Sequence, residues 1–180
     1  MLKGLREWLD SRRRARRFWA HYGAAEGDDF IKSCYAILIS ELSDKTLGSI
    51  VAAQPVEQQP TFWIAYACFL VGLFREAVQA RANADLACRL TDGLFRNLQK
   101  HRGYDSEMLW RVWSVVDQAM PDALTSVGPE TGVRAPWVRI VEATNRAGFS
   151  LNQVSSFSFM IYIEFVCKRV YGAVNAALVT

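Results

Sequence analysis

The sequence predicts an all-α fold, an irregular bundle of about six to eight helices around a single core. Apolar residues recur every three or four positions along most of the chain, and the alternating pattern typical of strands is scarce. The 180 residues, 51% hydrophobic and 22% charged, suit one globular domain. With no internal repeat or linker, we expect a basic N-terminal helix at residues 1–23 on a helical bundle at 24–180, one domain overall.

The first expected helix, residues 2–22, is amphipathic. On a helical wheel its apolar residues fall within an arc of about 200°. Arg12 and Arg16 also fall inside this arc, where their stems can lie along apolar surface. Residues 1–17 carry seven basic and two acidic side chains, whereas the remaining chain carries 14 basic and 16 acidic ones. The positive charge is therefore concentrated at the N-terminus. The apolar residues are Leu2, Leu5, Trp8, Leu9, Ala15, Phe18, Trp19 and Tyr22.

The next two helices are separated by a proline-marked break. Asp28 or Asp29 can cap a helix through residue 42, in which apolar residues recur at core spacing. A break that has room for a short helix then extends to Pro60. The helix that begins near Thr61 is apolar on every side until Arg75, which predicts a position at the centre of the bundle.

Two further helices show one apolar face each. The segment near residues 85–102 places four leucines on one face, and the pairs Asp85–Arg89 and Asp92–Arg96 on the other predict a half-exposed helix that ends at Gly103. The following helix begins at Asp105 or Ser106 and ends or kinks at Pro121. The core residues expected in these two helices are Leu86, Leu90, Leu94, Leu98, Leu109, Val112, Trp113, Val116 and Met120.

The longest irregular region expected is the loop at residues 121–136, with room for one helical turn near residues 123–126. Loops of this length are often functional. Pro136 then suits the first turn of a short helix that closes at Gly148. A capping box at residues 150–153 begins the last helix, which extends to Leu178.

Two uncharged runs are long enough to raise the question of a membrane span. Residues 61–74 would cover about 21 Å as a helix, less than the ~30 Å hydrocarbon core. Seven of the seventeen residues at 147–163 are Gly, Ser, Asn or Gln, which are costly in lipid. Both runs are predicted to be buried core helices, and no N-terminal signal sequence is recognised, so we expect a cytoplasmic protein. The widely spaced Cys34, Cys68, Cys88 and Cys167 are predicted to be buried free thiols.

The sequence contains no familiar catalytic, nucleotide-binding or metal-binding motif, and we predict no cofactor and no metal. A cluster of His21 with Glu26, Asp28 and Asp29 is better explained by helix capping. His101 suits a helix C-terminus, where a cation is favoured. Glu41 and Asp44 could form a catalytic carboxylate pair, but exposed acidic residues at a helix end are more common. The six tryptophans are expected to be core and interface residues rather than a ligand pocket.

Glu164 is a further candidate. It is the only charged residue between Arg146 and Lys168, which predicts a carboxylate in apolar surroundings that is either paired or functional. Pairing with Lys168, four residues on, is the simplest explanation.

The apolar arc of the first helix needs to be buried away from water. Burial of each large apolar side chain is worth up to ~1.5–3 kcal/mol, whereas anionic lipid attracts each basic residue by ~1 kcal/mol. The apolar arc therefore decides where the helix docks, and the arginines modify that choice. The bundle itself, a partner protein or a membrane surface could supply the site. The candidate binding residues are Leu5, Trp8, Leu9, Arg12, Arg13, Arg16, Arg17, Phe18 and Trp19.

The leading functional hypothesis is a non-enzymatic protein–protein interaction module, such as an adaptor, a chaperone or an inhibitor or immunity-type protein. It would act through helical surface or through the loop at residues 121–136. The alternative is a peripheral membrane protein attached through the N-terminal helix, and an enzyme of unfamiliar type comes third. Nucleic acid is disfavoured because the rest of the chain is net acidic. The sequence does not specify an oligomeric state.

Overall fold

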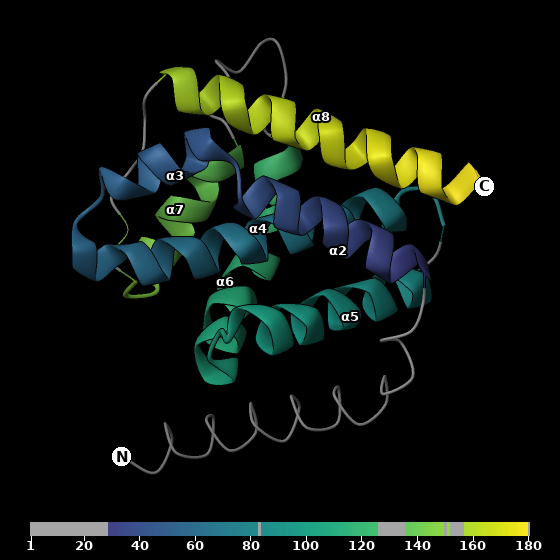
Figure 1. Ribbon diagram of the computed structural model, residues 1–180, viewed down its shortest axis with the longest axis horizontal. Coiled ribbons are helices and arrows are strands. Elements are labelled where there is room, and N and C mark those ends of the chain that lie inside the picture. The colour runs from purple at the N-terminus through teal and green to yellow at the C-terminus, as the bar shows by residue number, and fades with distance from the viewer. Residues whose placement is uncertain (1–28, 83, 126–135, 150, 152–156, 180) are drawn as a thin grey trace.

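The computed structural model describes residues 29–82, 84–125, 136–149, 151 and 157–179. Within these ranges the chain forms seven α-helices and one short 3-10 helix, without a strand, and the helices pack around one core (Figure 1). The prediction of an all-α bundle is confirmed. The predicted N-terminal helix, residues 126–135 of the predicted loop and the predicted capping box at 150–153 lie outside the described residues, apart from Leu151.

The bundle has α4 at its centre. In Figure 1, α8 crosses one side of the molecule, α5 crosses the opposite side, and α4 lies between them. The elements are α2 (Asp29–Leu42), α3 (Lys45–Ala52), η2 (Val56–Gln58), α4 (Gln59–Gln79), α5 (Ala84–Arg102), α6 (Ser106–Thr125), α7 (Pro136–Arg146) and α8 (Phe157–Val179).

The central position of α4 follows from its apolar circumference. Every residue from Ile64 to Phe74 is buried, and α4 contacts all the other α-helices of the described chain. Three of its aromatic rings, those of Phe62, Tyr66 and Phe69, surround Trp137 of α7, with ring centroids 5.3–5.6 Å apart. By length and composition Val56–Gln79 could cross a membrane, but 78% of its most apolar window is buried inside the bundle. The prediction of a core helix here is confirmed.

Several helix ends follow the local signals in the sequence. Asp44 caps α3, because the backbone N–H groups of Thr46 and Leu47 donate to its Oδ1 at 2.7 and 3.4 Å. Gly103 and Gly148 adopt positive φ angles of 66° and 89° just beyond α5 and α7, the conformation that ends helices most readily at glycine. Pro136 occupies the first position of α7.

The expectation that this helix could end at Pro121 is wrong, because α6 continues to Thr125 with Pro121 inside it. Pro121 is exposed, while Met120 and Ala123 on either side of it are fully buried. Packing of these two side chains holds the helix beyond the proline, where local propensity alone would favour a break.

The prediction for α5 is confirmed for its leucine face and is wrong for one residue of the opposite face, Asp92. Leu90, Leu94 and Leu98 are buried as expected. Arg89 and Asp85 form an exposed pair, but Asp92 is fully buried and lies 3.2 Å from Nε of Arg96. The i,i+4 spacing is the same in both pairs, so the spacing predicted the contact and not its burial.

The last helix, α8, is buried along one stripe only. Ile163, Val166, Val170 and Val174 are fully buried, and they pack toward α4 and α2. On the opposite side, Phe165 is 54% exposed. The expectation that the run at residues 147–163 is a buried core helix is also wrong, because Ile161 within it is 38% exposed and α8 lies at the edge of the bundle (Figure 1).

Candidate functional site

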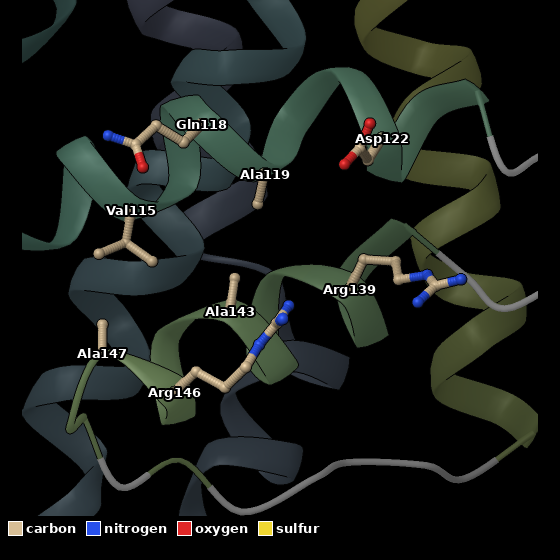
Figure 2. Close-up of a pocket in the computed structure, with 8 residues that line it drawn as sticks. All are labelled: Val115, Gln118, Ala119, Asp122, Arg139, Ala143, Arg146 and Ala147. Carbon is tan, nitrogen blue, oxygen red and sulfur yellow. The ribbon is translucent and has the colours of Figure 1, made fainter.

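A groove of about 620 Å³ lies between α6 and α7 (Figure 2). Its walls combine small apolar residues with polar and charged ones. It is lined by Val115, Gln118, Ala119 and Asp122 of α6, by Arg139, Ala143 and Arg146 of α7, and by Ala147 just beyond α7.

The register of the two helices explains why this space is open. Val115 and Ala119 are four residues apart on α6, and Ala143 and Ala147 have the same spacing on the other side, so small side chains line up in a row on each wall. The neighbouring larger side chains, such as Met120 and Ile140, turn inward and are fully buried. The helices therefore pack closely on their inner sides and leave a trough on their outer sides.

The two arginines of the groove are only partly paired within the described structure. Nη1 of Arg139 lies 3.5 Å from Oε2 of Glu142, and Nε of Arg139 is buried without an acceptor among the described residues. Nε of Arg146 donates to the backbone carbonyl of Glu142 at 3.3 Å, and within the described part of the chain Arg146 has no carboxylate partner. In Figure 2 its guanidinium extends along α7 toward Arg139, whereas the Arg139 side chain points the other way.

These side chains can bind a ligand but offer little for catalysis. Arginine is suited to binding carboxylates because its planar fork donates two parallel hydrogen bonds. Among the described lining residues there is no histidine, cysteine, serine or threonine, and Asp122 is the one carboxylate that could act as a nucleophile or transfer a proton.

A second polar cluster joins α2 and α8. Arg169 of α8 donates to both carboxylate oxygens of Glu41 of α2, from Nε at 2.7 Å and from Nη2 at 2.6 Å. The Glu41 side chain is only 7% exposed. The guanidinium of Arg169 also lies 5.9 Å from the ring centroid of Tyr162, a cation–π distance. Because it links α8 to α2, we interpret this cluster as a structural attachment of the last helix.

Burial also disfavours ionisation of several tyrosine and cysteine side chains. It raises the pKa of Tyr66 well above its ordinary value and that of Tyr162 to about 12. It also raises the pKa of the Cys167 thiol to about 12, and that of Cys68 further still. Since the thiolate is the nucleophilic form of cysteine, burial disfavours the nucleophilic form of both thiols.

The cysteine prediction is confirmed in part. All four thiols are free; Cys34 and Cys68 are buried, while Cys88 and Cys167 are half-buried. Among the described residues, no group of three or more His, Cys, Asp or Glu side chains could hold a metal ion.

The candidate residues on the bundle have different roles from those considered. The idea of Glu164 as a buried carboxylate is wrong, because its side chain is 63% exposed, although its predicted pairing with Lys168 is confirmed at 2.7 Å. Glu41 and Asp44 do not form a pair, since one binds Arg169 and the other caps α3. Glu41 is also buried rather than exposed at the helix end.

The remaining candidates lie at helix ends or outside the described residues. His101 is exposed in the last turn of α5, with its ring 5.8 Å from that of Tyr35. Asp29 pairs with Lys32 at 3.0 Å. His21, Glu26 and Asp28 are not described, and neither are the nine binding candidates Leu5, Trp8, Leu9, Arg12, Arg13, Arg16, Arg17, Phe18 and Trp19.

Sequence reasoning missed the groove and the Glu41–Arg169 pair. The alanines at 143 and 147 give a weak signal for the groove, since small residues four apart mark a shallow helix face. No local signal could link Glu41 to Arg169, because 128 positions separate them.

Comparison with known proteins finds no matching protein family, curated protein or solved structure. The chemistry of the chain's own surfaces is therefore the basis for a functional proposal.

Proposed function

We propose that the protein is a non-catalytic protein-interaction module and that the α6–α7 groove binds a helical segment of a partner protein. The partner segment carries an acidic side chain beside small apolar ones. The observation that supports this most directly is the combination, in one open trough, of two facing rows of small side chains with an arginine that has no carboxylate partner in the described structure.

The shape of the groove favours a helix as the bound element. A trough between two helices accepts a third helix whose side chains interdigitate with its walls, and this mode of recognition is common in protein complexes. The rows formed by Val115 with Ala119 and by Ala143 with Ala147 allow close approach of such a helix.

The charge of the groove favours an acidic residue on that helix. Arg139 already contacts Glu142, but Arg146 donates only to a backbone carbonyl within the described structure. A partner carboxylate beside Arg146 would form a charge-assisted hydrogen bond that is partly shielded from water.

The position of the predicted loop agrees with this proposal. Residues 121–125 belong to α6, and Asp122 lines the groove. Pro136 begins α7, so the segment between them connects the two walls. A partner that occupies the groove lies on the same pair of helices that this segment joins.

Affinity capture from the native host tests the proposal. We expect wild-type protein to retain a stoichiometric partner that Arg146→Glu loses, because the substituted carboxylate repels an acidic segment. We expect Ala143→Gln to lose it as well, because the longer side chain fills the trough. Arg89→Glu is the matched control, since Arg89 is exposed on α5 and pairs with Asp85 away from the groove.

The result that would contradict this function is retention of the same proteins by wild type, Arg146→Glu and Ala143→Gln. Circular dichroism and thermal melting of each variant confirm that the bundle is intact before the capture is interpreted. Both groove residues have side chains at the surface, so we expect changes in stability within about 0.5 kcal/mol.

The charge asymmetry of the sequence supports a second candidate, peripheral attachment to an anionic membrane through residues 1–23. Flotation with anionic liposomes at low salt tests it, by comparing the full chain with a chain that lacks these residues. Attachment predicts flotation of the full chain only, and its absence from the lipid fraction would exclude this candidate. The proposed setting is the cytoplasm in either case, in line with four unpaired cysteines.

A further inference from the structure

The outer side of α8 exposes two large apolar side chains, and the ammonium of Lys168 lies 5.9 Å from the ring centroid of one of them, Phe165. Ile161 and Phe165 are 38% and 54% exposed, and they are two of the three exposed large hydrophobic residues in the described chain. With Lys168 and Gly172 they lie on one side of α8, opposite its buried stripe. A surface of this kind on a long outer helix often marks a contact with another protein.

Gly172 lies near the middle of this outer side, and packing within the chain does not require a glycine there. A Cβ atom added at Gly72 would lie 2.7 Å from Cε of Met120, and one at Gly93 would lie 2.6 Å from Cγ2 of Ile31, so close packing accounts for both of those glycines. A Cβ atom at Gly172, as at Gly48 in the short helix α3, would meet nothing within 4 Å. Glycine lowers helix stability at such a position, and a close approach from outside would account for it.

We propose that the outer side of α8 pairs with α8 of a second copy of this chain, antiparallel, about a two-fold axis that passes between residues 166 and 167. Ile161 and Gly172 are equally far from this axis on its two sides. Ile161 therefore lies level with Gly172 of the partner subunit, which places a large side chain over a position that has none. Phe165 lies close to the axis and contacts Phe165 of the partner subunit. This surface is separate from the α6–α7 groove and does not depend on it.

The charges on α8 favour this orientation. Glu164 and Lys168 lie on the same flank of the outer side and pair with each other at 2.7 Å within one chain. About the proposed axis, that flank meets the same flank of the second copy, so Glu164 lies beside Lys168 of the partner subunit, and the contact occurs twice. Parallel pairing would instead bring opposite flanks together and place Lys168 beside Arg169 of the partner subunit, which is repulsive.

Arg169, on the other flank, does not oppose the pairing. Its guanidinium already makes two hydrogen bonds to the Glu41 carboxylate of its own chain. The charge of each Arg169 is therefore already balanced by Glu41 of its own chain before the subunits meet.

One helix from each subunit forms a small contact, at the lower end of the size range for specific interfaces. We therefore expect a reversible dimer. Sedimentation equilibrium of the full chain, from micromolar to near-millimolar concentration, should show the mass rising from 20.3 kDa toward twice that value.

Gly172→Gln is the decisive variant. In the monomer its side chain has free space and improves helix propensity, so the melting temperature of the dilute protein should rise. In the dimer it occupies the position that receives Ile161, so the dissociation constant should increase roughly tenfold or more. The matched control is Gly48→Gln, at the other open helical glycine, which should leave dimerisation unchanged.

Charge exchange tests the orientation. Glu164→Lys and Lys168→Glu should each weaken the dimer several-fold, and the double variant should restore it. A wild-type chain that stays monomeric at the highest concentration would overturn the proposal. So would a dimer that Gly172→Gln leaves intact, or a monomer whose α8 outer side instead binds anionic vesicles.

Discussion

The two longest apolar helices, α4 and α8, have similar lengths of 21 and 23 residues and opposite surroundings. Every side of α4 meets another helix, and its residues from Ile64 to Phe74 are all buried. In α8 a single stripe, which includes Val166 and Val170, is buried, and Phe165 on the other side is 54% exposed. The two helices are of similar apolar character and differ in how many neighbours they have.

This difference shows which apolar surfaces become buried when a single chain folds. Burial of α4 inside one chain satisfies the hydrophobic driving force of its whole circumference. On α8 the same force is satisfied on one side only, so the other side is available for association. The three predictions below test this comparison, beginning with the largest effect.

The largest effect expected is a contrast between two phenylalanines. Phe69→Ala in α4 should lower the free energy of unfolding by ~3–5 kcal/mol, because it leaves a cavity beside Trp137 in a core that cannot collapse. Phe165→Ala in α8 should change it by less than about 0.5 kcal/mol in dilute protein. Urea denaturation of both variants gives the two values. Equal losses would show that the outer side of α8 is packed within the monomer.

A smaller effect is expected at the attachment of α8. Arg169→Met removes both hydrogen bonds to the nearly buried Glu41 carboxylate, which should cost ~1–3 kcal/mol because that charge loses its partner. Lys168→Met breaks the exposed pair with Glu164 and the contact of the ammonium with the Phe165 ring, and it should cost about 0.3–1 kcal/mol. Thermal melting in dilute protein compares the two variants. Equal melting temperatures for Arg169→Met and Lys168→Met would show that the Glu41–Arg169 contact does not stabilise the fold.

A further effect is confined to alkaline solution. Burial raises the pKa of Tyr162 from its ordinary value of 10.0 to about 12, so the folded state binds this proton more tightly than the unfolded chain does. The stability that it contributes is complete below pH 10 and is lost as the pH rises toward 12. Tyr162→Phe should therefore lose less stability over this range than wild type, as measured by urea denaturation at several pH values. Equally steep losses in both proteins would contradict this assignment.

Much of the fold could be predicted because its signals are local. An apolar circumference predicted the central position of α4, and positive-φ glycines at 103 and 148 end two helices where the sequence indicated. Pro136 begins α7 as expected. Each of these signals depends on backbone geometry or on the hydrophobicity of a few neighbouring residues.

What could not be predicted depends on contacts between distant elements. Asp92 is buried where an exposed residue was expected, and Glu164 is exposed where a buried one was expected. Both belong to i,i+4 ion pairs, and this spacing occurs on inner and outer helix faces alike. The partner of Glu41 lies 128 positions away. The groove likewise exists only because α6 and α7 meet at one register, so the sequence shows its alanines but not the space between them.

The measurement that tests the comparison most directly is side-chain footprinting of the full chain at low and high protein concentration. Labelling of Phe165 should fall as the concentration rises, because pairing of two α8 helices covers its ring, while Phe69 should stay unlabelled throughout. Labelling of Phe165 that is the same at every concentration would contradict the proposed pairing.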